Sequence, residues 1–256
     1  MTLFDRNNFP RFKGAGLILR QYRKESDLEI PWLIRKVPVC TSTENLIATW
    51  SDCLSGCNKI PLALIAERQN YGFGQHGRSW SSPRGGVWIS TAFPPLKGVY
   101  SNQIINLAVA LCLSECLEKK GINAAIKWPN DIYYDDRKLA GILTRLIYRG
   151  TSLRLVRVGI GLNVLNKVPV EGISLKQVCK ESNLSIEFWS AQVLLALDKL
   201  YYFSSKPDLI ISEVERRLWS GQIKDIETGE LWSVDGLEKD GSIRLINGHN
   251  TKLMKH

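Results

Sequence analysis

The chain has 256 residues, of which 44% are hydrophobic and 23% charged, as in an ordinary globular protein. No apolar run approaches the roughly 18 residues that cross a bilayer, which excludes a membrane-spanning chain. Lysine and arginine number 34 against 25 aspartate and glutamate, and the formal charge of +9 favours an acidic partner.

Two further classes are disfavoured by what the chain lacks. The first twenty residues carry charges and no continuous apolar core, so we expect no signal peptide and a cytoplasmic location. The basic residues are scattered, without a zinc finger or an RNP-type motif, which argues against nucleic-acid binding. The six cysteines form no CxxC pair and the three histidines are dispersed, so we expect neither a disulfide nor a structural metal.

Apolar periodicity and turn residues predict an N-terminal extension over residues 1–33, irregular up to residue 30, followed by a main domain over 34–218. The predicted strands of this domain are 33–39, 61–67, 87–93, 125–128, 132–134, 138–148 and 153–164. The predicted helices are 44–54, 101–120, 187–203 and 208–219. Consecutive strands with few crossover helices favour a mixed sheet over a doubly wound one. Short strands and turns over 219–256 predict a small β-barrel.

Residues 71–80 read YGFGQHGRSW, and their three glycines predict a loop between two strands. Glycine permits backbone conformations that are closed to other residues and lets a ligand approach the main chain. The loop is either a surface turn or a backbone cradle for an anion or a small ligand. The glycines by themselves do not decide between these two interpretations.

A second cluster of polar residues occupies 126–143, IKWPNDIYYDDRKLAGIL. Pro129 fixes a turn, which places Asn130 and Asp131 where the chain leaves a strand. Lys127 and Lys138 are expected at opposite ends of a hairpin, close enough to face one pocket. Such a set suits a reaction in which negative charge develops on phosphate oxygens. The alternative is that both lysines are solvated charges of a strand edge.

The third cluster is VGIGLNV, at the end of a predicted strand. Gly159 and Gly161 permit close backbone approach, and Asn163 offers a donor and an acceptor to a planar heterocycle. The chain has no GxGxxG that opens a helix and no GxxxxGK[ST] loop. Any ATP must therefore be held by other means.

Taken together, these motifs resemble those of the biotin–protein ligases, over about residues 34–256. The resemblance rests on STEN at 42–45, AERQNYGFGQHGRSWSSPRGG at 66–86, KWPND at 127–131, RKLAGIL at 137–143 and GIGLN at 159–163. It implies an α+β fold, with a mixed β-sheet and packed helices in a catalytic biotin- and ATP-binding domain over 34–218. A small SH3-like β-barrel over 219–256 would follow.

The resemblance also implies a reaction and its participants. Biotin's carboxylate attacks the α-phosphate of Mg-ATP to give biotinyl-5′-adenylate, and a lysine of the biotin carboxyl carrier protein of acetyl-CoA carboxylase then displaces AMP. ATP, Mg²⁺ and biotin are thus the expected cofactors and substrate, with the protein as a monomer or homodimer. Some members carry an N-terminal DNA-binding domain. Only residues 1–33 precede the core here, so we expect no DNA binding.

Residue roles follow from the same resemblance. The expected catalytic residues are Lys138, Lys127 and Asp131, with Asp131 also the expected Mg²⁺ ligand. The expected biotin-binding residues are Ser42, Thr43, Gln69, Gly72, Phe73, Gly74, Gln75, Lys138, Gly159 and Gly161. The expected nucleotide-binding residues are Arg78, Trp80, Lys127, Asn130 and Asn163.

The chain departs from the family pattern at two places. The family's loop is typically GRGRRGR, whereas residues 72–78 read GFGQHGR. Our hypothesis is an active enzyme that retains its adenylate less tightly, because charge-assisted hydrogen bonds are lost. The second departure is Glu44, where the family often has Asn. Either Asn45 takes that role in a shifted register, or the contact is absent.

Three alternatives stay open at this point. A lipoate ligase shares the catalytic fold, although KWPND and RKLAGIL favour the biotin branch. A non-catalytic biotin-binding paralogue would have lost activity together with its loop arginines. A nucleic-acid-binding module would show salt-dependent binding.

Overall fold

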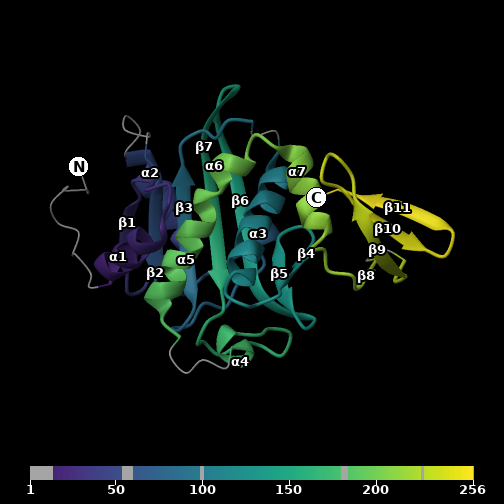
Figure 1. Ribbon diagram of the computed structural model, residues 1–256, viewed down its shortest axis with the longest axis horizontal. Coiled ribbons are helices and arrows are strands. Elements are labelled where there is room, and N and C mark those ends of the chain that lie inside the picture. Colours follow the sequence, from purple (N-terminus) through teal and green to yellow (C-terminus); the bar gives the residue numbers. More distant parts are fainter. Residues whose placement is uncertain (1–13, 54–59, 99–100, 180–183, 226–227, 256) are drawn as a thin grey trace.

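The computed structural model describes residues 14–53, 60–98, 101–179, 184–225 and 228–255. Figure 1 shows a large sheet with helices packed against it and a smaller sheet at the C-terminal end of the chain. The predicted mixed sheet with packed helices is confirmed. Residues 1–13 of the predicted extension, and Cys57, lie outside the described residues.

Seven strands form the large sheet, in the order β1-β2-β3-β7-β6-β5-β4. Their bounds are β1 Leu33–Val37, β2 Leu62–Ala66, β3 Val87–Phe93, β4 Ala125–Lys127, β5 Asp131–Tyr134, β6 Arg137–Arg149 and β7 Ser152–Leu162. The β1–β2 pair is parallel and the other pairs are antiparallel. The sheet is therefore mixed, with the long β6–β7 hairpin near its middle (Figure 1).

The helices divide between the two faces of this sheet. Their bounds are α1 Ala15–Glu25, α2 Thr43–Cys53, α3 Asn102–Glu118, α4 Leu175–Val178, α5 Ile186–Asp198, α6 Leu200–Phe203 and α7 Pro207–Glu215. The main core joins α3 and α5 to one face, where Ile65 and Val158 point. A second cluster joins Ile47 and Trp50 of α2 to Leu64 on the opposite face. Alternation along each strand therefore leaves one face for the core and the other for α2 and its neighbouring loops.

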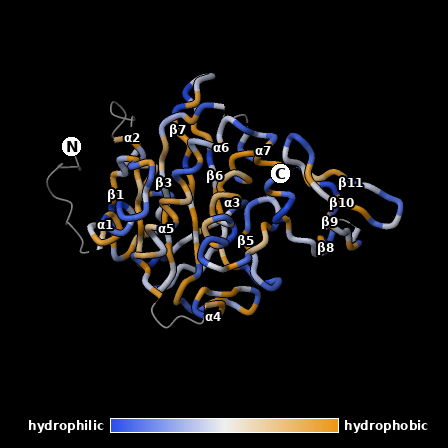
Figure 2. Tube along the Cα trace, viewed as in Figure 1, coloured by the Kyte–Doolittle hydropathy of each residue, from blue (hydrophilic) through white to orange (hydrophobic). Residues whose placement is uncertain are grey.

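Figure 2 shows hydrophobic segments along the strands of the large sheet and along α3, with hydrophilic segments in the surrounding connections. Helix α3 begins after Ser101, whose Oγ accepts a hydrogen bond from the Ile104 N–H. Nearly every residue of α3 is buried, which makes it the central helix of the core. No helix among the described residues has the length and apolar character that a membrane span requires.

Two predictions for the helical segments were wrong. Residues 15–25 form a helix, α1, where an irregular segment was predicted. Ile18 and Tyr22 lie one turn apart and are buried, and the Tyr22 hydroxyl donates to Asp198 of α5, so tertiary packing stabilises this helix. The helix predicted over 187–203 is interrupted after Asp198 and resumes as α6.

The C-terminal part is a four-stranded antiparallel sheet in the order β11-β10-β9-β8, where the sequence predicted a small barrel. Its strands are β8 Gln222–Lys224, β9 Leu231–Leu237, β10 Ile243–Asn247 and β11 Asn250–Met254. The Trp128 indole N–H donates to the Gly241 carbonyl at 2.9 Å, and the Leu237 N–H donates to the Glu215 carboxylate at 2.8 Å. The first bond attaches the small sheet to the β4–β5 turn, and the second attaches it to the end of α7.

Candidate functional site

A cavity of about 430 Å³ opens on the α2 side of the large sheet. This volume lies in the range that holds a small organic ligand. Its wall contains fourteen of the residues that the sequence singled out: Ser42, Thr43, Gln69, Phe73, Gly74, Gln75, Arg78, Trp80, Asn130, Asp131, Lys138, Gly159, Gly161 and Asn163. The fold thus brings the separate motifs to one site, while Gly72 and Lys127 lie outside the wall.

The floor of the cavity is made of glycines on β6 and β7. Gly141 pairs with Gly161, and the Trp80 indole lies against both. A Cβ added at Gly161 would come within 2.4 Å of Trp80 Nε1, and one at Gly141 within 2.9 Å of Trp80 Cζ3. A Cβ at Gly159 would meet nothing closer than Ser90 Oγ at 3.5 Å. The Trp80 indole therefore requires glycine at 141 and 161, whereas a Cβ at Gly159 would make only ordinary van der Waals contacts.

Lys138 and Asp131 form an ion pair of 2.7 Å at one end of the cavity. The Lys138 Nζ also lies 4.9 Å from the centroid of the Trp80 ring. Burial raises the pKa of the Asp131 carboxyl, although the positive charges of Lys138, Lys127 and Arg78 oppose the shift. Asp131 Oδ1 is buried without a hydrogen-bond partner. This end of the cavity thus holds the Lys138 ammonium and one carboxylate oxygen without a hydrogen-bond partner.

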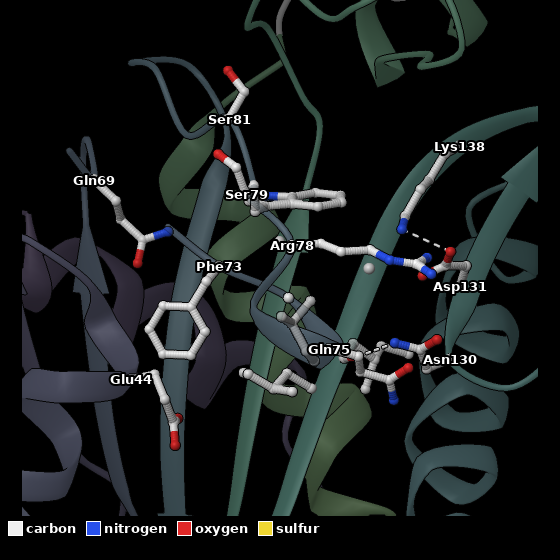
Figure 3. A pocket seen from close by; sticks show the side chains of 18 of the residues that line it. Glu44, Gln69, Phe73, Gln75, Arg78, Ser79, Ser81, Asn130, Asp131 and Lys138 are labelled. Atoms are coloured by element: carbon white, nitrogen blue, oxygen red, sulfur yellow. Dashed lines mark hydrogen bonds and ion pairs between the residues drawn. The ribbon is translucent and has the colours of Figure 1, made fainter. Parts of the chain in front are cut away.

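Arg78 and Gln75 reach the same end from the glycine loop. Figure 3 shows Arg78 extending toward Asp131 and Lys138, with Gln75 near Asn130. The loop is held by a hydrogen bond from the Trp80 N–H to the Gly72 carbonyl and another from the Gly74 N–H to the Arg78 carbonyl, both 2.8 Å. A Cβ at Gly72 would come within 2.6 Å of Ser82 Oγ, so this glycine serves the packing of the loop.

Lys127 occupies a different environment from Lys138. Its Nζ lies 4.4 Å from the Tyr133 ring centroid and 4.2 Å from that of Trp219, and it donates to the Tyr133 hydroxyl. Burial lowers the pKa of this ammonium. Lys127 is opposite Asp131 in the register of β4 and β5, and it is not among the residues that line the cavity. Its predicted role at the phosphates stays a prediction.

The predicted biotin-binding amide, Gln69, is already engaged within the protein. Its Oε1 accepts from the Thr43 N–H at 2.7 Å and from the Thr43 hydroxyl at 3.0 Å, and its Nε2 donates to Ser82 Oγ at 2.8 Å. The Thr43 hydroxyl also contacts Ser90 Oγ at 2.8 Å. Gln69 and Thr43 therefore brace the loop against α2 in this structure.

Two predicted nucleotide-binding amides also bond to the protein. The Asn130 Nδ2 donates to the Ile142 carbonyl at 2.5 Å, which fixes the turn after Pro129 against β6. The Asn163 Oδ1 accepts from Asn166 Nδ2 at 2.9 Å. Both side chains line the cavity, and their contacts with a nucleotide stay predictions.

Glu44 is the residue whose importance the sequence left undecided. It is buried in the wall of the cavity, whereas Asn45 is exposed, so the register is not shifted. The sequence did contain a signal that Glu44 lies near the site, because Glu44 follows Ser42 and Thr43 and falls in the first turn of α2. Gly141, Ser90, Pro169 and Glu171 also line the cavity, and none of them was assigned a role from the sequence.

Residues 37–163 match the model of the Biotin/lipoate A/B protein ligase family. Biotin–protein ligase 2 of Arabidopsis thaliana is 32% identical over 157 residues, which cover 57% of this chain and 46% of that protein. The biotin–[acetyl-CoA-carboxylase] ligase of Paracoccus denitrificans is 33% identical over 104 residues, or 40% of this chain and 43% of that protein.

The fold agrees with these matches. The biotin protein ligase of Aquifex aeolicus, solved in complex with biotin and ATP, superposes with a TM-score of 0.68 at 25% identity, over 86% of this chain and 94% of that one. The matched segments span less than half the length of the two relatives named above. From this match and the likeness in fold, residues 37–163 form a domain of the biotin/lipoate A/B protein ligase family.

Proposed function

We propose that this protein is a biotin–protein ligase, which activates biotin with ATP and transfers the biotinyl group to a lysine of a biotin carboxyl carrier protein. The observation that carries the proposal is the Lys138–Asp131 ion pair at the wall of a glycine-floored cavity. The cavity has the size of a small-molecule site and holds positive charge at one end, which suits a carboxylate and a triphosphate. Lipoate is not favoured, because the relatives named above are biotin ligases.

In the first step, an oxygen of the biotin carboxylate attacks the α-phosphorus of ATP. A new P–O bond forms while the bond from the α-phosphorus to the oxygen bridging to the β-phosphate breaks, and pyrophosphate leaves with that electron pair. Negative charge grows on the phosphate oxygens. Lys138 and Arg78 reach this end of the cavity and oppose that charge, which lowers the barrier.

In the second step, the amine of the carrier lysine attacks the acyl carbon of biotinyl-5′-adenylate. An amide C–N bond forms, the C–O bond to AMP breaks, and the lysine nitrogen loses a proton. We assign the acceptance of this proton to Asp131, and two observations support the assignment: burial raises its pKa, and its Oδ1 has no hydrogen-bond partner. A carboxylate is a poor acyl donor and AMP is a good leaving group, which is why the adenylate must form first.

Magnesium that arrives with ATP would be held by Asp131, and when bound it would neutralise phosphate charge. The fit is chemical: Mg²⁺ is commonly held by one or two carboxylates together with substrate phosphates. Among the described residues, no group of three or more His, Cys, Asp or Glu side chains stands close enough to hold a metal alone. The cytoplasm is the proposed location, where ATP and a carboxylase carrier are both present.

The test is transfer to a carrier. The protein is incubated with biotin, Mg²⁺, ATP and an isolated biotin carboxyl carrier domain, and the carrier is analysed by intact mass spectrometry. We expect the mass gain of one biotinyl group, absent from a carrier whose acceptor lysine is replaced by arginine. A carrier that stays unmodified while the protein binds biotin would contradict the proposal and support a binding paralogue.

A further inference from the structure

Trp219 packs against the strands that carry the ion pair of the proposed active site. It lies between α7 and β8, in the connection from the large sheet to the small one. Its backbone N–H donates to the Ile126 carbonyl at 2.9 Å, and the Ile126 N–H donates to the Arg217 carbonyl at 2.7 Å. Residues 217–219 therefore run alongside β4, at the edge of the large sheet.

The side chain of Trp219 reaches three neighbouring parts of this sheet. Its indole N–H donates to Asp136 Oδ1 at 2.7 Å. Its ring centroid lies 5.9 Å from that of Tyr133 on β5. The Lys127 ammonium of β4 lies 4.2 Å from the Trp219 ring centroid and 4.4 Å from the Tyr133 ring centroid. One indole thus joins β4, β5 and the turn that leads into β6.

The strand register makes these contacts neighbours of the Lys138–Asp131 ion pair. Lys127 is directly opposite Asp131 on β4 and β5, and Tyr133 is directly opposite Lys138 on β5 and β6. Directly opposite residues of an antiparallel pair share a face of the sheet, with Cβ atoms about 4.5–5.5 Å apart. Each member of the ion pair therefore stands beside a side chain that Trp219 contacts.

The bond to Asp136 acts on the turn before Lys138. Asp135 and Asp136 form the two-residue turn between β5 and β6, with φ angles of 45° and 59°. The bond from the Trp219 indole holds the second of these residues. Because Lys138 follows Asp136 by two residues, a displacement of the turn also displaces the backbone of Lys138.

We propose that Trp219 is a positioning residue for adenylate formation, which holds Lys138 and Asp131 in the geometry that the reaction uses. The inference rests on the function proposed above. Trp219 is not among the residues that line the cavity, so it acts through other side chains. It acts through three residues that also lie outside the cavity wall: Lys127, Tyr133 and Asp136.

Positioning predicts an effect on rate and little effect on binding. A group that stabilises developing charge must be placed accurately, and a misplacement of about 1 Å can cost 10²-fold in rate. Much of the cavity wall belongs to the start of α2, the glycine loop and β7, which Trp219 does not join. Affinity for biotin should therefore survive the loss of the indole contacts.

The bond between the indole and the carboxylate can be removed from either side. Trp219→Phe keeps an aromatic ring and removes the N–H donor. Asp136→Gly removes the acceptor, and glycine tolerates the positive φ of this position. Asp136→Asn keeps an oxygen acceptor and also suits that φ, so it is the conservative variant that should retain activity. The double variant Trp219→Phe/Asp136→Gly completes a mutant cycle.

Two control variants reproduce these changes without the loss of the bond. Trp189→Phe shortens a buried indole of α5, outside the cavity wall, whose Nε1 has no hydrogen-bond partner in the described part of the chain. Asp135→Gly introduces glycine into the same turn, at a residue that is not the acceptor of the indole bond.

The test measures biotinyl-AMP formation in single turnovers with labelled ATP, at saturating biotin and varied ATP concentration. The maximal rate and the half-saturating ATP concentration are thereby separated, and calorimetry gives the affinity for biotin. We expect Trp219→Phe and Asp136→Gly each to lower the maximal rate by about 5- to 20-fold, with both binding measures within about twofold of wild type. The double variant should be no slower than the slower single variant. Asp136→Asn and the two controls should react as wild type does.

Three results would overturn the inference. The first is a maximal rate within twofold of wild type for both Trp219→Phe and Asp136→Gly. The second is an equal loss in the controls, which would mean that any truncation disturbs the site. The third is additive losses in the double variant, which would mean that the two residues act separately. If Trp219→Phe does not fold, Asp136→Gly and its comparison with Asp136→Asn and Asp135→Gly decide the question.

A second measurement separates this inference from the proposed function. Wild-type protein that forms no adenylate contradicts the ligase, and amide hydrogen exchange over residues 131–141 then decides whether Trp219 positions these strands. Faster exchange in Trp219→Phe and Asp136→Gly than in Asp135→Gly supports the positioning role. Equal exchange in the three variants overturns it.

Discussion

Lys138 and Asp131 face each other across neighbouring strands β6 and β5, with 2.7 Å between Nζ and Oδ2. The contact joins RKLAGIL to KWPND, two motifs that are separate in sequence. It holds the lysine at the cavity end where Arg78 and Trp80 also lie. A substrate carboxylate or phosphate can replace Asp131 as the partner of this ammonium. The ion pair therefore holds the Lys138 ammonium in position for the proposed reaction.

Replacing Lys138 should therefore affect the chemical step. For Lys138→Met, we expect kcat for adenylate formation to fall by roughly 10²–10³-fold, the usual cost of removing one group that stabilises developing charge. Pyrophosphate release assayed at saturating biotin and ATP measures this directly. Lys36→Met is a matched control, because Lys36 also pairs with carboxylates but lies away from the cavity. A kcat within threefold of wild type for Lys138→Met would contradict the assignment.

The glycines of the cavity floor predict that two alanine variants differ, one losing stability and the other losing affinity for biotin. Gly161→Ala places a methyl group within 2.4 Å of the Trp80 indole, so Trp80 must move, and we expect unfolding free energy to fall by about 1–3 kcal/mol. Gly159→Ala meets only ordinary contacts and should fold normally, yet its methyl enters the cavity and weakens biotin binding.

Urea unfolding and calorimetry distinguish the two effects. Gly16→Ala in α1 serves as the control, since no atom lies within 4 Å of its added methyl and alanine favours a helix. Equal stability losses for Gly159→Ala and Gly161→Ala would show that the floor is not arranged as described.

Asp198 predicts a pH dependence of stability. Its carboxylate accepts from the Tyr22 hydroxyl at 2.7 Å and the Trp32 indole at 2.8 Å, and burial raises its pKa from 3.8 to about 6. The folded state then holds a proton that the unfolded state has released. The contribution to unfolding free energy is full below about pH 4, declines as pH rises toward 6, and is lost above that.

The shift corresponds to roughly 3 kcal/mol between the two limits. Urea unfolding between pH 4 and pH 8 should show this decline in wild type, after subtraction of the profile of Asp198→Asn. A difference profile that is flat, or that rises with pH, would mean that Asp198 is ionised in the folded protein.

The contact of Trp128 with Gly241 predicts that the small sheet influences the site. Trp128→Phe keeps an aromatic ring but leaves the Gly241 carbonyl without its donor. We expect a loss of about 1 kcal/mol in stability and a several-fold higher KM for ATP, because Trp128 precedes the turn that carries Asn130 and Asp131. Trp32→Phe removes a comparable bond to Asp198 outside the cavity wall, and should lower stability without changing that KM.

One prediction made from the sequence concerns how tightly the glycine loop holds the adenylate. If Phe73 and Gln75 hold the adenylate less tightly than arginines would, the double variant Phe73→Arg/Gln75→Arg should release less free biotinyl-AMP into solution. Chromatography of the filtrate after a single turnover measures the released fraction. Release from wild type that is no faster than from the variant would remove this hypothesis.

Much of the site could be predicted because its motifs are local. YGFGQHGR, KWPND and GIGLN each lie at a strand end, and the sheet brings them to one cavity. The contacts of a residue inside that cavity were harder to predict, because they depend on partners that are distant in the sequence. Gln69 was expected to bind biotin, and this role stays a prediction: in this structure its Oε1 accepts from Thr43 and its Nε2 donates to Ser82.

Glu44 and α1 show the same limit in two other ways. The ion-pair partners of the Glu44 carboxylate, Arg145 and Arg157, lie on β6 and β7, about 100 residues away in the sequence, so only the fold brings them to it. Helix α1 is amphipathic, with Ile18 and Tyr22 one turn apart on its buried face, a pattern that was overlooked in the sequence, and the Tyr22 hydroxyl bonds to Asp198, 176 residues away. The partner of Tyr22, unlike the helix itself, could not be predicted from local sequence.

The central claim is that the cavity joins biotin to AMP. The most direct measurement incubates the purified protein with biotin, Mg²⁺ and α-labelled ATP, without a carrier, and separates the products by chromatography beside a Lys138→Ala control. We predict labelled biotinyl-AMP that depends on biotin, is nearly absent from the variant, and disappears when a carrier domain is added. Biotin bound by the wild-type protein with no labelled adenylate would contradict the account.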